Sequence, residues 1–226
     1  MSVDLRGKVV FVTGSSIGIG REIACAFAAA GANLAITYYE HREEAEATAA
    51  RARKLGAADV VVLPFDAADD ESIREVVEAL VEHFGGLDIL VSNAGTVVWK
   101  PFLQQGFGEI EAQLRVNVEG VLKVTWACLP LLRDAIINIG STATLHTSHT
   151  PATYVAGKWA VRGFTKALAH EYPDKRVFCI HPTVTATRMN DYRGMAPERV
   201  AEVVVKVARG ELDLPSGGDV DMRQFA

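Results

Sequence analysis

The chain of 226 residues is long enough for one large domain with a buried core, and 49% of its residues are hydrophobic and 23% charged. This balance excludes disordered, collagen-like and coiled-coil classes. The formal net charge of -5 offers no basic surface, so we expect neither nucleic acid nor a membrane as a partner. The opening residues lack the pattern of a signal peptide, which predicts a cytoplasmic protein.

Short β-branched segments alternate with longer helical patterns along the chain. The first strand, Lys8–Thr13, leads through a glycine-rich turn to an alanine-rich helix that stops at Gly31. Further strands are expected at Asn33–Tyr38, Asp59–Pro64, within Leu87–Gly95, at Ala135–Ile139 and at Arg176–Ile180. Further helices are expected at Arg42–Leu55, Asp70–Phe84, Ile110–Leu132, Thr153–Tyr172 and Pro197–Arg209, with a turn and one short strand after Gly210.

This alternation predicts βαβ units with short, right-handed connections. The expected fold class is α/β: one Rossmann-type domain over residues 1–226, built on a doubly wound parallel sheet with helices on both faces. The cysteines Cys25, Cys128 and Cys179 lie far apart in apolar segments and are expected to be buried structural thiols.

The segment TGSSIGIG, Thr13–Gly20, follows the first strand and opens a helix. Its glycines permit a tight turn and close approach of the backbone to a pyrophosphate, and the helix N-terminus supplies free N–H donors. A flexible turn is the alternative, but the strand-turn-helix setting favours a dinucleotide site. The residues expected to contact the cofactor there are Gly14, Ser16, Ile17, Gly18 and Ile19.

Tyr154 and Lys158 are four residues apart in a helical pattern, which places both side chains on one face. A cation near the phenol stabilises the phenolate and lowers the tyrosine pKa, as a general acid or base at working pH requires. The alternative for such a pair is a surface lysine beside a half-buried tyrosine.

Together, these residues resemble the classical short-chain dehydrogenase/reductase family over nearly the whole chain. TGSSIGIG is similar to its TGxxxGxG element, Ser92–Gly95 (SNAG) to its NNAG element, and Tyr154 with Lys158 to its YxxxK element. Ser141, after the strand IINIG, stands at the place of the family's catalytic serine, and Asn117 matches the asparagine of its long central helix.

The resemblance implies an NAD(P)-dependent oxidoreductase that transfers a hydride between nicotinamide and a carbonyl or secondary alcohol. In this chemistry Ser141 holds the carbonyl oxygen and Tyr154 exchanges its proton. Lys158 binds ribose hydroxyls and lowers the tyrosine pKa, and the Asn117 side chain supports a water that links Lys158 to solvent. The compact chain most resembles 3-oxoacyl-carrier-protein reductase-like members, so an acyl-carrier substrate is one expectation. A cofactor-binding regulator without turnover is the alternative function.

Further cofactor contacts follow from the resemblance. Asp66 is expected at the adenine amine, with helix capping as the alternative, and Asn93 and Gly95 along the cofactor channel. The segment HPTVTATRM is similar to the family's PGxxxT stretch, with Pro182 over the nicotinamide and Thr187 near its carboxamide or the phosphates. Thr183 replaces the usual glycine of that stretch.

The choice between NADP and NAD depends on the end of the second strand. Tyr38 and Tyr39 stand where many family members carry an acidic marker for NAD or a basic marker for NADP. Glu40 repels a 2′-phosphate or accepts from a 2′-hydroxyl, whereas His41 and Arg42 are able to bind the phosphate. We favour NADP over NAD, with Arg42 as the phosphate contact.

Trp99, His146 and His149 are expected to line the substrate mouth beside Ser141 and Tyr154. A metal at the histidine pair is not expected, because neither a carboxylate nor a cysteine accompanies the pair locally. Only nine residues, 188–196, separate Thr187 from the next helix, too few for a two-helix lid, so we expect an open site.

The two helices that flank the catalytic residues carry more apolar residues than one sheet face covers, which predicts a homo-oligomer, a tetramer or a dimer. These residues are Val118, Val121, Leu122, Trp126, Leu129, Trp159, Phe164 and Leu168.

Overall fold

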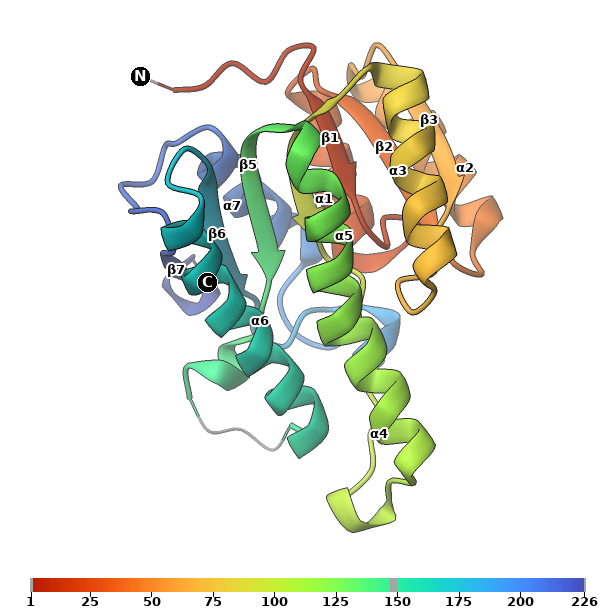
Figure 1. The fold of residues 1–226 in the computed structure, drawn as a ribbon, viewed down its shortest axis with the longest axis vertical. Coiled ribbons are helices and arrows are strands. Elements are labelled where there is room, and N and C mark those ends of the chain that lie inside the picture. Colours follow the sequence, from red (N-terminus) through yellow and green to blue (C-terminus); the bar gives the residue numbers. More distant parts are fainter. Residues whose placement is uncertain (1, 147–149, 226) are drawn as a thin grey trace.

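A computed structural model describes residues 2–146 and 150–225 of the chain (Figure 1). One sheet has the strand order β3-β2-β1-β4-β5-β6-β7, and all neighbouring strands pair in parallel. The winding direction reverses between β1 and β4, which is where such sheets bind their ligands. The predicted doubly wound parallel sheet with helices on both faces is confirmed.

Most elements lie within one or two residues of the predicted bounds. The strands are β1 (Val9–Val12), β2 (Asn33–Tyr38), β3 (Val60–Pro64), β4 (Leu87–Ser92), β5 (Leu132–Ile139), β6 (Arg176–His181) and β7 (Asp219–Asp221). The helices are α1 (Gly18–Ala29), α2 (Arg42–Leu55), α3 (Asp70–Phe84), α4 (Phe107–Leu114), α5 (Gly120–Cys128), α6 (Ala152–Glu171) and α7 (Pro197–Ala208). The final strand predicted after Gly210 is present as β7.

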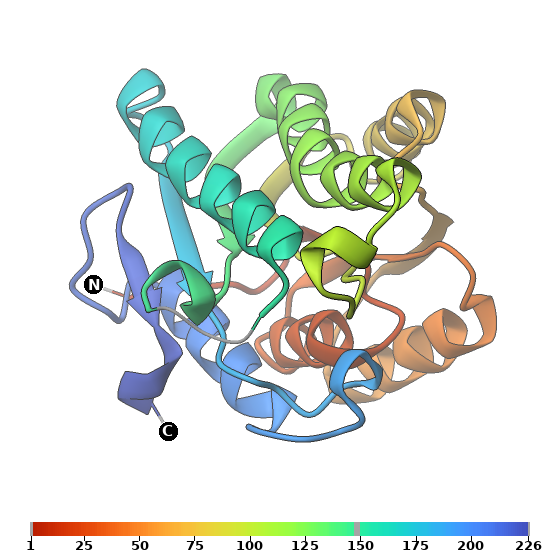
Figure 2. The same cartoon turned by 90° about the horizontal axis from the view of Figure 1, so that it is seen from below.

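Two helical layers cover the sheet (Figure 2). One apolar core packs α1, α2 and α7 on one face, with Phe27, Ala49 and Val204 fully buried. The other packs α3, α5 and α6 on the opposite face through Leu80, Val124 and Leu168. Because both faces are covered, the inner strands are continuous apolar runs such as VVFV of β1, and all three cysteines are buried thiols as predicted.

Local capping explains why some bounds were predictable. At the start of α3 the Asp69 carboxylate accepts hydrogen bonds from the backbone N–H groups of Glu71 and Ser72. At its end Gly85 adopts the left-handed conformation, with φ 68°, and donates to the carbonyl of Val81. Both capping residues lie next to the helix ends that they determine.

The prediction of one helix over Ile110–Leu132 is wrong. The helix starts earlier, at Phe107, because the Glu109 carboxylate accepts from the Gly106 N–H. A π-helical turn, Arg115–Glu119, then separates α4 from α5. A 3-10 turn at Leu129–Leu131 ends the helical run, and β5 begins at Leu132, three residues before the predicted strand, where it pairs with Leu87 of β4.

Candidate active site

The carboxyl ends of β1, β4, β5 and β6 bring the candidate residues to one edge of the sheet. This edge faces the viewer in Figure 2. The glycine-rich turn follows β1, the SNAG segment ends β4, and Ser141 follows β5. The edge therefore joins the predicted nucleotide and catalytic elements at the point where the strand order reverses.

The glycine-rich turn packs closely against the start of α1. Gly14 has a left-handed conformation, with φ 63°, and a Cβ on Gly20 would lie 2.3 Å from the Gly14 carbonyl oxygen. The apolar Ile17 occupies the N-cap position of α1, so the first N–H groups of the helix are left for an anion. These residues fit the pyrophosphate of a dinucleotide.

Buried hydrogen bonds hold this turn in place. The Thr37 hydroxyl accepts from the Gly14 N–H at 3.0 Å. The Asn93 amide nitrogen donates to the carbonyls of Thr13 and Gly14 at 3.0 and 3.1 Å. Asn93 was expected along the cofactor channel; its amide also braces the turn, a contact that sequence reasoning missed.

Ser141, Tyr154 and Lys158 come together as the sequence predicts. Tyr154 and Lys158 lie one turn apart on α6, with the Lys158 Nζ atom 5.7 Å from the centre of the Tyr154 ring. The Ser141 hydroxyl is near enough to the Tyr154 phenol to lower its pKa. The buried Lys158 Nζ donates to the carbonyl of Ile139 at 2.8 Å, at the end of β5. A hydroxyl, a phenol and an ammonium group therefore share one small region.

The pKa values of Tyr154 and Lys158 differ from expectation in one respect. Burial raises the pKa of the Tyr154 phenol to about 12, and the nearby Ser141 hydroxyl opposes this rise. Burial also lowers the pKa of the Lys158 ammonium to about 8. We expected Lys158 to hold the tyrosine pKa low; here its ammonium is directed to the Ile139 carbonyl instead.

Asn117 lies in the π-helical turn, and its side chain is engaged with the backbone of Thr96. Its Oδ1 accepts from the Thr96 N–H at 2.8 Å, and its Nδ2 donates to the Thr96 carbonyl at 2.7 Å. The side chain was expected to support a water. In the structure it fixes the loop after β4, because the main chain of that loop supplies a matching donor and acceptor, and the water contact stays a prediction.

Other predicted cofactor residues lie around the same edge. Asp66 Oδ1 accepts at 2.8 Å from the Ala68 N–H in the turn before α3, whose N-cap is Asp69, so Asp66 does not cap that helix. A Cβ on Gly95 would lie 3.7 Å from the Lys158 Nζ atom, which places Gly95 beside the catalytic lysine. Its predicted place in the channel is compatible with this position.

The segment after β6 reaches the glycine-rich turn from the other side. The Pro182 carbonyl accepts from the Thr142 N–H at 3.0 Å, next to Ser141. A Cβ on Gly18 would lie 3.3 Å from the methyl group of Thr187. Thr187 therefore sits at the start of α1, in the position expected for a phosphate or carboxamide contact.

Arg42 is exposed in the first turn of α2, at the end of the cleft where the adenosine half is expected. In the same turn Glu44 forms an ion pair of 3.1 Å with Arg188, which follows Thr187. This pair joins α2 to the segment after β6.

The predicted substrate residues do not all meet. The Trp99 indole N–H donates to the Met189 carbonyl at 2.8 Å, and 58% of the Trp99 residue is exposed. His146 is instead hydrogen-bonded to Arg223, in the 3-10 turn that ends the chain. His149 lies outside the described residues. The segment after Thr187 holds a single 3-10 turn, Arg188–Asn190, which agrees with the predicted absence of a two-helix lid within residues 188–196.

Sequence reasoning missed a buried polar cluster behind Ser141. Cys179, His181 and Asp219 bring their ligand atoms within 4.8 Å of one another. The Asp219 carboxylate already carries ion pairs with Arg162 and Lys166 at 2.8 and 2.9 Å, so its charge is compensated by the protein itself. The signal available in the sequence was a histidine at the end of an otherwise apolar strand.

Comparison with known proteins agrees with this geometry. The model of the short chain dehydrogenase family matches residues 8–197, most of the chain. The chain belongs to the short-chain dehydrogenase/reductase family. This family of oxidoreductases includes the 3beta-hydroxysteroid dehydrogenase 1 of Eggerthella lenta, 32% identical over 219 residues that cover 94% of this chain and 84% of the relative.

A solved structure of similar size extends the likeness to the whole fold of this short-chain dehydrogenase/reductase. It is a short chain dehydrogenase from Burkholderia cenocepacia J2315 in complex with NADP, with a TM-score of 0.91, 32% identity and 97% of each chain covered. The 11-beta-hydroxysteroid dehydrogenase-like 2 of Arabidopsis thaliana is 31% identical over 193 residues, 82% of this chain. This chain spans only 62% of that relative's length.

In the described residues, 2–146 and 150–225, none of the helices has the length and apolar character that crossing a membrane requires.

Proposed function

We propose that the protein is an NAD(P)-dependent oxidoreductase that transfers a hydride between nicotinamide and a carbonyl or secondary alcohol. The observation that supports this most is the convergence of Ser141, Tyr154 and Lys158 at the edge that carries the glycine-rich turn. The Ser141 hydroxyl lowers the pKa of the Tyr154 phenol, and the Lys158 Nζ atom lies 5.7 Å from the centre of the phenol ring.

In this proposal the bound nicotinamide supplies or accepts the hydride at carbon. Ser141 donates a hydrogen bond to the substrate oxygen and holds it near Tyr154. Tyr154 gives its proton to that oxygen in reduction and takes it in oxidation. Lys158 binds the ribose hydroxyls, and its positive charge stabilises the phenolate, which offsets the effect of burial on the Tyr154 pKa.

Two further roles complete the assignment. The N-terminus of α1 and Thr187 bind the phosphates, and Asp66 binds the adenine amine through the oxygen that Ala68 leaves free. Asn117 acts through Thr96 and so shapes the channel wall next to Gly95. To the proposed role of Asn117 we add this support of the channel wall.

NADP is the proposed cofactor in preference to NAD, with Arg42 as the 2′-phosphate contact. The solved relatives in complex with NADP and NADPH support this choice. The proposed substrates are small-molecule ketones and alcohols, with a 3-oxoacyl group on a carrier as the specific candidate. A site bounded by one 3-10 turn after Thr187 is compatible with a tethered substrate.

A panel of carbonyl compounds tested with NADPH and NADH is the deciding experiment. We expect steady-state oxidation of the reduced cofactor with at least one compound, and a higher kcat/KM with NADPH. Cofactor binding by fluorescence without turnover over the whole panel would contradict the proposal and favour the regulator. A higher kcat/KM with NADH would overturn the cofactor assignment alone.

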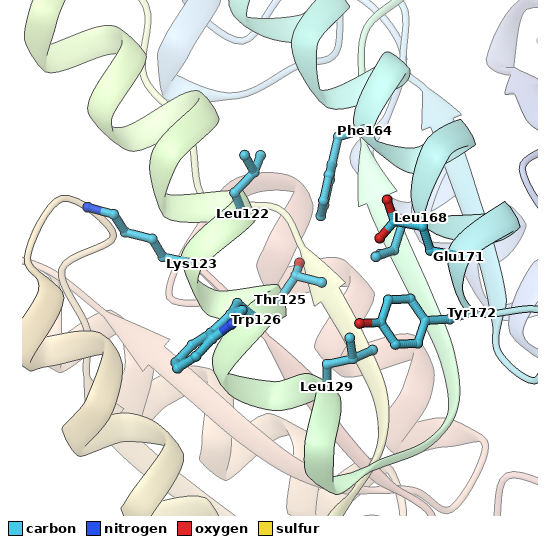
Figure 3. Close-up of a pocket in the computed structure, with 9 residues that line it drawn as sticks. All are labelled: Leu122, Lys123, Thr125, Trp126, Leu129, Phe164, Leu168, Glu171 and Tyr172. Carbon is cyan, nitrogen blue, oxygen red and sulfur yellow. The ribbon is translucent and has the colours of Figure 1, made fainter.

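A homo-oligomer, a tetramer or a dimer, is the proposed assembly. A hollow of about 350 Å³ lies between α5 and α6, and its lining is largely apolar (Figure 3). Trp126 projects beside it with 79% of its surface exposed. A soluble chain rarely leaves such a patch uncovered, and a second copy would bury it across a two-fold axis.

Light scattering at micromolar concentration tests the assembly. We expect a mass of two or four chains for the wild type and a smaller mass for Trp126→Glu, which places a charge in the apolar hollow. A monomeric wild type would contradict the assembly. The cytoplasmic location stays a prediction from the sequence.

A further inference from the structure

A buried histidine lies directly behind the catalytic serine, and the mechanism above does not use it. His181 ends β6 and is 0% exposed. Its Nδ1 atom is 3.1 Å from the carbonyl oxygen of Ser141, and its Nε2 atom is 2.9 Å from Oδ1 of Asp219. Since the Asp219 carboxylate and the Ser141 carbonyl oxygen only accept hydrogen bonds, the ring joins them with a proton on each nitrogen, an imidazolium that burial disfavours, by lowering the pKa of His181, and that the Asp219 carboxylate favours.

Asp219 is in turn held by two cations from the catalytic helix. The Arg162 guanidinium donates to both carboxylate oxygens, at 3.1 and 2.8 Å, and Lys166 lies 2.9 Å away. These partners and the ring hold the pKa of the Asp219 carboxyl far below its usual range, although its partial burial opposes this. Asp219 is therefore a carboxylate of fixed position.

The other end of this network grips the segment that carries Ser141. The Thr144 hydroxyl donates to the Ser141 carbonyl at 2.8 Å and lies 3.2 Å from His181 Nδ1. Arg162 donates through Nη1 to the Thr144 carbonyl at 3.0 Å. A Cβ on Gly140 would lie 2.6 Å from His181 Nδ1, so the ring packs against the peptide that precedes the serine.

An apolar side chain would fill this space without the cost of burying an imidazole and a carboxylate. The polar residues form hydrogen bonds that fix the orientation of the Ser141 peptide. Apolar packing alone would leave this peptide free to tilt. The Ser141 Oγ accepts from the Ala143 N–H at 3.2 Å and meets Tyr154, so a tilt of this peptide moves the catalytic hydroxyl.

We propose that His181 and Asp219 are positioning residues that fix the Ser141 backbone and thereby hold its hydroxyl in line with Tyr154. This inference rests on the proposed oxidoreductase function. Neither residue touches the reacting atoms, and both act through the Ser141 carbonyl and its neighbour Thr144.

Two substitutions of His181 distinguish the contact of Nδ1 with Ser141 from the contact of Nε2 with Asp219. Asparagine places an amide atom about where Nδ1 lies, so His181→Asn keeps a partner for the Ser141 peptide and loses Asp219. His181→Gln reaches the position of Nε2, keeps Asp219 and loses the serine. We expect His181→Gln to lower kcat about 10- to 100-fold, since misplacement by about 1 Å costs up to 10²-fold.

We expect His181→Asn to stay within about threefold of the wild type, and both variants to keep cofactor affinity. Equal loss of kcat in both variants would indicate a purely structural residue and overturn the proposal. Unchanged kcat in both would overturn it as well. The comparison remains informative if one variant is less stable, because the matched variant differs by one methylene group.

An ion pair between neighbouring strands provides a matched control for the Asp219 carboxylate. Asp219→Asn is expected to lower kcat about tenfold with KM for the carbonyl substrate nearly unchanged. Asp134 forms a similar ion pair of 2.8 Å with Arg176, at the opposite edge of the sheet from the active site. Asp134→Asn is expected to lower the melting temperature while kcat is retained; an equal loss of kcat would contradict the positioning role.

Crystal structures of the two His181 variants test the inference without turnover. We expect the Ser141 carbonyl and hydroxyl to move in His181→Gln and to stay in place in His181→Asn. An unmoved Ser141 in the glutamine variant overturns the positioning role, whatever the assay gives. A wild type that turns over none of the carbonyl panel overturns the proposed function, whereas the position of Ser141 in the variants still decides this inference.

Discussion

Two regions border the proposed cofactor site, and they are held together differently. The floor consists of the glycine-rich turn, Thr13–Gly20, with the ends of β4 and β5. Buried side chains bond its backbone: the Thr13 hydroxyl accepts from the N–H groups of Asn93 and Ala94, and Ser15 accepts from the Thr37 N–H at 2.9 Å. The floor is thus shaped before any ligand binds.

The opposite border is residues 188–196, which follow Thr187 and which we call the strap. Surface contacts tie it down on two sides: the Trp99 indole reaches the Met189 carbonyl, and Arg188 pairs with Glu44. Its residues Asp191 and Tyr192 have φ of 57° and 59°, a left-handed conformation that is costly for side chains other than glycine. Tyr192 is also 66% exposed.

The difference separates two tasks. Chemistry that every substrate shares needs atoms fixed in advance, and the floor provides them. Substrate discrimination and cofactor entry tolerate movement of the strap. Its exposed contacts contribute little energy and so allow that movement. Substitutions in the floor should therefore act on kcat or on cofactor affinity strongly, and those in the strap weakly and mainly on KM.

The largest effect is expected above the floor at Tyr154. Tyr154→Phe removes the proton donor and keeps the ring, so kcat should fall at least about 100-fold while cofactor affinity stays nearly constant. Steady-state kinetics and cofactor fluorescence measure the two quantities. Tyr172→Phe, at the far end of the same helix, is the control and should retain turnover. Near-normal turnover by the Tyr154 variant would remove that residue from the mechanism.

The next largest effect concerns the flank of the cleft at α2. Arg42→Ala should weaken NADPH binding about 10- to 100-fold more than NADH binding, since a charged hydrogen bond contributes about 1.5–3 kcal/mol. Binding titrations with both cofactors measure the ratio. Lys54→Ala, exposed at the other end of α2, should leave the ratio unchanged. Equal losses for both cofactors would show that Arg42 is only a solvated helix residue.

A methyl group inserted into the floor tests how tightly it is packed. In Gly20→Ala the new Cβ would lie 2.3 Å from the Gly14 carbonyl and 2.5 Å from the Asn93 amide. Overpacking costs about 1–3 kcal/mol, so we expect a lower melting temperature and cofactor affinity weaker by more than about tenfold. Gly163→Ala, at an exposed and open position of α6, should raise stability by about 0.5–1 kcal/mol. Unchanged cofactor affinity in Gly20→Ala would show that the turn yields easily.

The smallest effect is expected in the strap. Trp99→Phe removes the indole N–H that holds the Met189 carbonyl, a hydrogen bond that contributes about 0.5–1.5 kcal/mol. We expect KM to rise about two- to tenfold with kcat within about twofold of the wild type. Glu44→Gln, which weakens the exposed pair with Arg188, should have a smaller effect still. A fall in kcat comparable to that of Tyr154→Phe would make the strap part of the catalytic machinery.

The sequence predicted what local residues encode. The bounds of α2 and α3 follow from a terminal glycine after each helix, and Tyr154 and Lys158 share a face because helix geometry alone requires it. Ser141 was placed by its distance from Tyr154 and by the strand before it. The Gly14 and Gly20 positions were readable because no other residue fits the turn.

Contacts between distant segments were not predictable in the same way. Asp219 meets His181 only because β7 pairs with β6, and the sequence offered no pattern that names this partner. Asn117 meets Thr96 because the central helix and the loop after β4 are neighbours in space. The contact of Lys158 with the Ile139 carbonyl was not predictable either, since that carbonyl belongs to β5.

The π-helical turn at Arg115–Glu119 sets the rotation of α5 relative to α4, so the number of residues in the central helical run matters. A π turn contains one residue more than an α turn, so α4 and α5 are out of phase with each other. This offset lets Asn117 face Thr96 while Gly120 lies against Ala67, where a Cβ would come within 2.5 Å of the carbonyl oxygen. Deleting a single residue here would rotate α5 by about 100° and drive a side chain into Ala67. An insertion or deletion in this helical run therefore changes which residues of α5 face the neighbouring segments.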